Sequence, residues 1–196
     1  MKKPIGSKKE RLFDKMTSAQ KIGNIFYLYP DRDFTLSAIA KEAGVSKGIA
    51  SDIIEELEKE DFVKVEKIGK KLWLIRANTE NPGFIKWKIY NNLTAIYNSG
   101  IVEFLDQHYN NPKAIVLFGS FRWGRDGKDS DIDIAVEVTE DIGYDVHSKF
   151  TALKEFENAL SRKVQIHVFN RKSLDLNMFN NIANGIVLSG FLEVKK

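Results

Sequence analysis

Two short groups of polar residues in the second half of the chain have the types and spacing for phosphate chemistry. Gly119 and Ser120 follow an apolar run at 114–118, and after ten further residues the chain reads Asp131-Ile132-Asp133. Alternate residues of a strand face the same side, so a strand starting at Asp131 projects both carboxylates together. Two adjacent carboxylates repel each other unless a cation lies between them, and Mg²⁺ binds such oxygens together with substrate phosphates. The pattern predicts a metal and phosphate site.

The residues between these two groups add candidates for phosphate contacts. Gly119 allows the backbone to approach a phosphate closely, and Ser120 offers a hydroxyl and neighbouring amides at a predicted helix start. Arg122, Arg125 and Ser130 lie in the same segment and are further candidate nucleotide ligands. Loop arginines of this kind are more often solvated surface charges than ligands, and both interpretations stay open for Arg122 and Arg125.

The elements that must position these residues alternate between strand and helix. Strands are predicted at 114–118, 131–138 and 163–169, with a short final segment at 185–188. Helices are predicted at 84–109 (interrupted near 99–100), 146–160 and 173–183. Alternation of this kind predicts an α/β layer structure for the second half of the chain.

The first half of the chain has a helix-turn-helix pattern. Helices are predicted at 17–29, from residue 35 or 37 to 43, and at 46–60, with the apolar positions Ile49, Ile53, Ile54 and Leu57 of the last one facing inward. Gly44 supplies the turn, and alternation on both sides of Gly69 predicts a hairpin. The order of these elements resembles a winged helix-turn-helix domain. Asn81-Pro82-Gly83 predicts a break, so we expect a winged-helix domain at 9–80 and a second domain at 84–196 whose leading helix is 84–110.

Winged helices commonly bind double-stranded DNA, and this one offers candidate contacts. They are Ser46, Lys47 and Ser51 at the start of the second helix of the motif, and Lys67, Lys70 and Lys71 in the wing. Lysines of this kind suit phosphates rather than bases. The same helix is acidic from Glu55 onward. Residues 1–77 hold only 16 Lys and Arg against 12 Asp and Glu, so the net charge by itself does not establish DNA binding. A contact between two copies of the chain, giving a homodimer, is the alternative role.

Composition excludes several classes of protein. The chain has no cysteine, so it contains no disulfide, no thiol nucleophile and no cysteine-bound zinc. It has no apolar run near the ~20 residues that span a bilayer. These features predict a cytoplasmic protein without a membrane segment.

The Gly-Ser pair, the ten-residue spacing and Asp-x-Asp resemble the minimal nucleotidyltransferases of the DNA polymerase beta superfamily. The resemblance covers residues 86–192, and Gly185-Ile-Val-Leu is similar to the usual end of that domain. It implies a small mixed sheet flanked by helices, with Gly119 and Ser120 holding a triphosphate. It also implies that Asp131 and Asp133 bind Mg²⁺ or Mn²⁺ and align the α-phosphate for in-line attack. The implied reaction is transfer of AMP from ATP to a protein or small-molecule acceptor.

One position departs from that family. The superfamily usually carries a third carboxylate on the strand that corresponds to 163–168, where this chain has Gln165. His167 shares the face of Gln165 and is the candidate to bind metal or accept a proton. Glu137 lies four residues beyond Asp133, which at ~3.3 Å per residue is too far to complete the same site. The alternative function is therefore a weakened transferase fold that acts as a DNA-binding regulator or an antitoxin.

Overall fold

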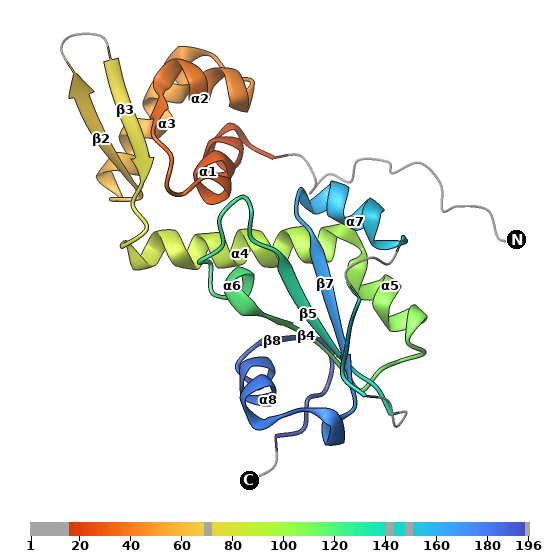
Figure 1. Ribbon diagram of the computed structural model, residues 1–196. Coiled ribbons are helices and arrows are strands. Elements are labelled where there is room, and N and C mark those ends of the chain that lie inside the picture. The colour runs from red at the N-terminus through yellow and green to blue at the C-terminus, as the bar shows by residue number, and fades with distance from the viewer. Residues whose placement is uncertain (1–15, 69–71, 140–142, 148–150, 195–196) are drawn as a thin grey trace, which may run out of the picture. The chain divides into compact units, whose positions relative to one another are not determined.

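The chain folds into two compact units, Met1–Asn78 and Thr79–Lys196. The computed structural model describes residues 16–68, 72–139, 143–147 and 151–194, and most of its elements are labelled in Figure 1. No helix in these described parts combines the length and apolar character required to cross a membrane.

The N-terminal unit is a winged helix-turn-helix domain, which confirms the prediction. Its elements are α1 (Ser18–Leu28), β1 (Phe34–Thr35), α2 (Leu36–Ala43), α3 (Lys47–Lys59), β2 (Val63–Ile68) and β3 (Leu72–Ala77). Thr17, Thr35 and Ser46 begin the three helices, each accepting a backbone N–H from the first turn. Gly44 lies at φ 67° between α2 and α3, a left-handed conformation that glycine adopts readily. The strands form an antiparallel sheet in the order β1-β3-β2.

One predicted core position of α3 is wrong. Ala50 and Ile54 are fully buried, whereas Ile49 exposes 45% of its surface. Ile49, Ile53 and Leu57 are spaced four residues apart, which suggested one inward stripe. The packing of α3 centres instead on Ala50 and Ile54, so Ile49 at the start of the helix lies beside the core. An exposed isoleucine therefore stands at the beginning of the second helix of the motif.

The C-terminal unit is built on one five-stranded sheet. Its elements are α4 (Pro82–Ser99), α5 (Ile101–His108), β4 (Ala114–Phe118), α6 (Gly119–Arg122), β5 (Ile132–Glu137), β6 (Asp145–His147), α7 (Leu153–Leu160), β7 (Val164–Phe169), the 3₁₀ helix η2 (Arg171–Ser173), α8 (Leu176–Ala183) and β8 (Ile186–Gly190). The strand order is β6-β7-β5-β4-β8. The β5–β7 pair is parallel and the other pairs are antiparallel, so the mixed sheet is confirmed.

The two faces of this sheet are covered differently. One face packs its isoleucines, valines and leucines against α4, α5 and α7. The opposite face carries a smaller cluster that includes Phe118, Ala135 and Ile182 of α8. Because β5 alternates, Ile132 and Ile134 enter the larger core while Asp133 faces the side that has the smaller one. The second face thus leaves room for polar side chains.

Three predicted element boundaries in this unit change. The helix expected over 173–183 begins only at Leu176, after the 3₁₀ helix Arg171–Ser173. The helix expected over 146–160 begins only at Leu153, and Asp145–His147 forms β6 instead. Val146 pairs with His167 of β7, so hydrogen bonding along a sheet edge outweighs the local helical spacing. Asn81 and Pro82, expected to form a break, begin α4: the Asn81 side chain accepts the Gly83 and Phe84 N–H groups.

Candidate functional site

Strand pairing brings the Gly119-Ser120 turn against the two aspartates. β4 ends at Phe118, which lies directly opposite Asp133 on the antiparallel neighbour β5. Asp131 immediately precedes β5, and both aspartates are partly exposed on the sheet face that has the smaller core. The ten intervening residues leave the sheet and return, so the two polar groups of the sequence meet where β4 ends and β5 begins.

Gly119 is required by the position of Asp133. It lies at φ +71°, a region that L side chains rarely adopt. A Cβ at this position would also lie 3.1 Å from Cγ of Asp133, tighter than ordinary van der Waals contact. The absence of a side chain at Gly119 therefore makes room for a carboxylate of this chain, in addition to any approach by a phosphate.

The third strand places Gln165 and His167 beside the aspartates. In the parallel β5–β7 pair, Gln165 is level with Asp133. Gln165 Nε2 donates a 2.6 Å hydrogen bond to Asp131 Oδ2, and His167 Nε2 lies 3.3 Å from Asp133 Oδ1. Among the residues that the structure describes, no three His, Cys, Asp or Glu side chains are grouped to hold a metal. Two carboxylates, an amide and an imidazole thus form the polar centre.

Glu137 takes no part in this centre. Its buried carboxylate receives two hydrogen bonds from Arg171, from Nε and from Nη2, each 3.2 Å long. A bidentate pair of this kind satisfies both carboxylate oxygens. Glu137 therefore ties β5 to the segment that follows β7.

Tyr144 is a member of the site that the sequence analysis did not identify. Its hydroxyl lies 2.6 Å from His167 Nδ1. Burial, and then the carboxylates of Asp133 and Asp175, raise the pKa of the Tyr144 hydroxyl, so it stays protonated at neutral pH. A neutral His167 ring with its proton on Nε2 satisfies both neighbours, accepting from Tyr144 and donating to Asp133. Both nitrogens of His167 are engaged in this arrangement. Tyr144 is 23 residues away in sequence and reaches His167 only because β6 pairs with β7.

The other candidate nucleotide ligands have their own contacts in the loop. The Arg122 guanidinium stacks on the ring of Trp123, 3.5 Å from its centroid. Arg125 is exposed, and the Ser130 hydroxyl accepts the Gly127 N–H at 2.9 Å. The structure thus gives Arg122 and Ser130 local roles in shaping the loop before Asp131.

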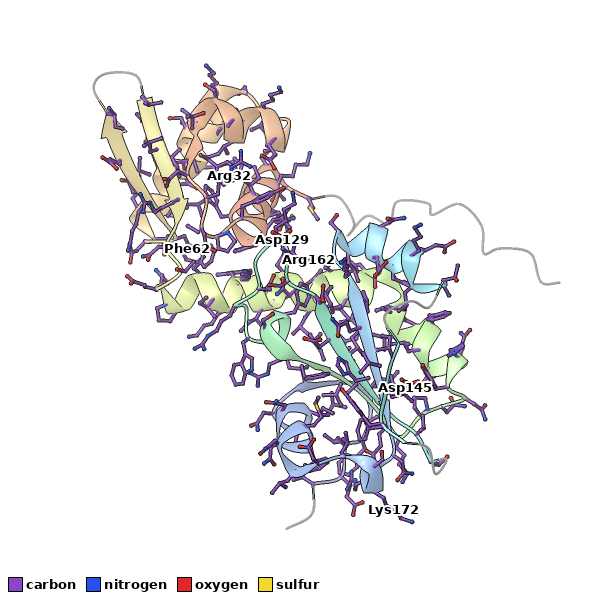
Figure 2. All side chains as sticks on the ribbon, in the orientation of Figure 1. Arg32, Phe62, Asp129, Asp145, Arg162 and Lys172 are labelled. Carbon is purple, nitrogen blue, oxygen red and sulfur yellow. The ribbon has the colours of Figure 1, made fainter. Side chains whose placement is uncertain are left out.

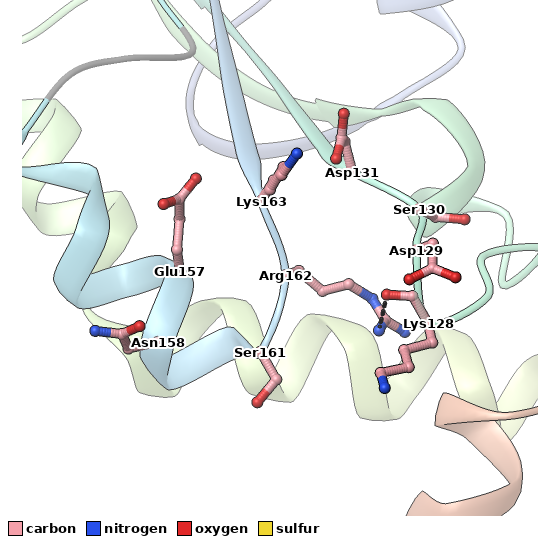
Figure 3. A pocket seen from close by; sticks show the side chains of 9 residues that line it. All are labelled: Lys128, Asp129, Ser130, Asp131, Glu157, Asn158, Ser161, Arg162 and Lys163. Carbon is pink, nitrogen blue, oxygen red and sulfur yellow. Dashed lines mark hydrogen bonds between the residues drawn. The ribbon is translucent and has the colours of Figure 1, made fainter.

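A hydrophilic pocket opens beside Asp131. Its volume is about 520 Å³, and its lining is drawn in Figure 3: Lys128, Asp129, Ser130, Asp131, Glu157, Asn158, Ser161, Arg162 and Lys163. All nine side chains are polar or charged. Arg162 and Asp129 lie at the end of the sheet where β5 and β7 begin, while Asp145 and Lys172 lie at the other end (Figure 2). The pocket therefore adjoins the aspartates on the side of β7.

The candidate DNA contacts of the N-terminal unit have mixed surroundings. The Ser46 hydroxyl caps α3 by accepting the Ile49 N–H at 3.3 Å, and Ser51 is half-buried. Lys47 is exposed, and the Lys67 ammonium lies 4.5 Å from the centroid of the Trp73 ring. Lys70 and Lys71 lie outside the described residues. Of these candidates, Lys47 is the one that places an exposed positive charge on α3.

Comparisons with known proteins identify the family of the C-terminal unit. Residues 99–190 match the family described as "Polymerase beta, Nucleotidyltransferase". The crystal structure of MepR, a transcription regulator of the Staphylococcus aureus multidrug efflux pump MepA, is similar with 16% identity and a TM-score of 0.36, over 48% of this chain and 67% of that one. The comparison with curated proteins finds no match. Residues 99–190, which contain the Gly119-Ser120 turn, both aspartates and β7, form a domain of the polymerase beta nucleotidyltransferase family.

Proposed function

We propose that the C-terminal unit is a metal-dependent nucleotidyltransferase that moves AMP from ATP to a protein or small-molecule acceptor. The observation that carries the proposal is the register of β4 and β5, which sets the Gly119-Ser120 turn against Asp133. A triphosphate held at that turn would have its phosphates beside both aspartates. α6 has only four residues, so the phosphates would meet individual amides and the Ser120 hydroxyl rather than a strong helix dipole.

The donor set of the site fits one Mg²⁺ or Mn²⁺. Asp131 and Asp133 share a face, and Mg²⁺ is typically bound by one or two carboxylates with substrate phosphates completing its octahedron. Such an ion would neutralise charge on the triphosphate and orient it for in-line attack. Gln165 supplies no third negative charge and cannot accept a proton. We therefore expect nucleotide binding to be retained better than turnover.

The pocket beside Asp131 is the proposed entry for the acceptor. Its lining has no apolar side chain, so a hydrophilic acceptor with hydroxyl groups suits it. Arg162 and Lys163 line it together with Glu157, so the surface can meet both signs of charge. In this arrangement the acceptor approaches Asp131 from the side of β7.

Labelled nucleotides test the proposal. The chain is incubated with Mg²⁺ or Mn²⁺ and each of the four nucleoside triphosphates labelled at the α-phosphate, alone and with proteins encoded by neighbouring genes. We expect α-label on an acceptor and release of pyrophosphate, most readily with ATP. A parallel incubation uses ATP labelled at the γ-phosphate, and transfer of that label would identify phosphoryl transfer and contradict the proposal.

The second candidate function is DNA-binding regulation, in which the transferase fold holds a nucleotide with little turnover. The observation that favours it is the surface of α3: Lys47 and Ile49 are exposed in its first turn, where helix-turn-helix proteins contact bases. Because both side chains are exposed, packing in the core of the domain does not account for either of them.

Binding to duplex DNA should then weaken steeply with salt, because phosphate contacts release counterions. Lys47→Ala should reduce the slope of log K against log salt by about one unit, and Lys59→Ala, an exposed lysine at the other end of α3, should leave it unchanged. Fluorescence anisotropy with a random-sequence duplex over a salt series measures both slopes. Absence of binding at low salt would make the winged helix a protein-binding module.

A further inference from the structure

A buried polar cluster lies beneath the loop that joins Ser120 to Asp131. Its centre is Asp126, which is 1% exposed, and its other members are Lys88 (1%), Asn92 (5%) and Arg162 (7%). Buried charges are costly unless they are paired and hydrogen-bonded. Lys88, Asn92 and Asp126 have no role in the chemistry proposed above, and Arg162 enters it only as part of the lining of the acceptor pocket. Lys88, Asp126 and Arg162 are buried charged residues of the unit.

The contacts of the cluster extend to α6, which contains Ser120. Asn92 Nδ2 lies 2.9 Å from both Asp126 Oδ1 and the carbonyl of Phe121, which is in α6 next to Ser120. Lys88 Nζ donates to the Asp126 carbonyl and lies 3.4 Å from Asp126 Oδ1. The cluster therefore holds the middle of the loop and the turn of α6 to α4.

Arg162 connects the same cluster to the third strand. Its Nη2 lies 3.3 Å from Asp126 Oδ2, and its Nη1 donates a 2.6 Å hydrogen bond to the Lys128 carbonyl, drawn in Figure 3. Lys128 is three residues before Asp131, and Arg162 is three residues before Gln165. The guanidinium thus bridges the approach to Asp131 and the start of β7.

Gly124 lets the loop lie directly on α4. A Cβ at Gly124 would lie 3.1 Å from Ile89 Cγ1 and 3.2 Å from the Ile85 carbonyl. Ile85, Lys88, Ile89 and Asn92 follow the i, i+3, i+4, i+7 spacing of one helix face. The loop therefore docks along a single stripe of α4, through packing at Gly124 and hydrogen bonds at Asp126.

We propose that Lys88, Asn92, Asp126 and Arg162 are positioning residues of the transferase site. They set the separation between the Gly119-Ser120 turn and Asp131, and so determine where the phosphates lie relative to the carboxylates. The inference rests on the proposed nucleotide site. A polar cluster serves this role because hydrogen bonds require particular distances and angles, so they favour one conformation of the loop. Apolar packing of similar volume would stabilise the fold but would restrict the loop conformation less closely.

Asn92→Ala tests the proposal, and Asn98→Ala, an exposed asparagine of α4, is the matched control. Affinity is read from the rise in melting temperature with increasing ATP at fixed Mg²⁺, after the melting temperature of each unliganded variant is measured. Asn92→Ala should weaken nucleotide affinity by about tenfold to a hundredfold, because small displacements of a positioned group have effects of this size. Asn98→Ala should stay within about twofold of the wild type. A less stable Asn92→Ala variant with wild-type affinity would overturn the proposal, because the cluster would then act on folding alone.

Arg162→Lys provides a second test that does not depend on Asn92→Ala folding. Lysine keeps the charge, but its single ammonium cannot bridge Asp126 and the Lys128 carbonyl as the planar guanidinium of Arg162 does. Positioning predicts loss of affinity in Arg162→Lys, whereas wild-type affinity would show that only the charge matters and would overturn the proposal.

Amide hydrogen exchange separates this proposal from the nucleotide proposal. In unliganded Asn92→Ala or Arg162→Lys, amides of residues 119–131 should exchange faster while those of β4 and β5 stay protected. A wild-type chain that gains no stability from ATP would refute the nucleotide site. The exchange result would still show whether the cluster holds the loop in position. Unchanged exchange in the loop of both variants would refute the positioning role.

Discussion

Replacing Asp131 and Asp133 together by Asn is expected to abolish the stabilisation of the chain by ATP and Mg²⁺. A ligand at about a hundred times its Kd stabilises the folded state by about 2.7 kcal/mol, which for a chain of this size corresponds to a rise in Tm on the order of 5–10 °C. The double variant loses the two charges that hold the cation, so its rise should fall to near zero. Differential scanning fluorimetry with and without EDTA measures the effect.

The structure predicts that this variant remains folded. The amide side chain introduced by Asp131→Asn keeps an oxygen that can accept the Gln165 hydrogen bond, and removing two adjacent negative charges relieves their repulsion. The Tm of the double variant without ligand should therefore equal or exceed that of the wild type. The matched control is Glu103→Gln with Glu155→Gln, two exposed carboxylates of α5 and α7, which should keep the full rise. An equal rise in the aspartate variant would place the nucleotide elsewhere.

Gln165→Asp is expected to raise the rate of nucleotide transfer by about 10²–10⁴-fold, the range typical of a general base. Gln165 is level with Asp133 on the adjacent strand, so a carboxylate there joins the other two and can accept the acceptor's proton. The measurement is single-turnover transfer of α-label. Gln165→Asn introduces a side chain of the same length as Gln165→Asp but without its charge, and it should give no increase.

The same substitution has a separate signature in stability. Gln165→Asp replaces the 2.6 Å hydrogen bond to Asp131 by a third negative charge, so the unliganded Tm should fall and Mg²⁺ should restore it. His167→Ala should lower wild-type turnover if the imidazole accepts the proton. Fast wild-type transfer that neither substitution changes would show that the third position of the site lies elsewhere. Nucleotide binding without transfer in every variant would favour the regulator.

Local sequence was sufficient to predict most elements near the site. Residues 114–118 are a continuous apolar run, which predicts a strand buried on both faces, and this strand is β4. Asp-Ile-Asp-Ile alternates and predicts that both aspartates share a face, in agreement with Ile132 and Ile134 entering the larger core. Ser46 marks the start of α3 because a cap depends on only a few consecutive residues. For α2 the sequence left residues 35 and 37 open, and the structure has Thr35 as the cap.

Contacts between segments that are far apart in the sequence decided the features that local patterns did not predict. The segment around Val146 has helical spacing, yet β7 offers it an open edge and it becomes a strand. Tyr144 joins the site through that same pairing, and no local pattern places it there. Spacing alone predicted Ile49 in the core, and the packing of α3 left it exposed.

The buried cluster shows most clearly what sequence by itself does not determine. Lys88, Asp126 and Arg162 lie far apart in the chain and have no shared spacing, and charged residues are ordinarily assigned to the surface. Their burial depends on α4, the loop and β7 meeting in the folded unit, where each charge finds its partner. The sequence by itself determined the two aspartates, the Gly-Ser turn and the strands that carry them, because those depend on neighbours within a few residues. Tertiary structure alone decided which distant side chains hold that loop in place, because their pairing energy exists only once the elements have packed.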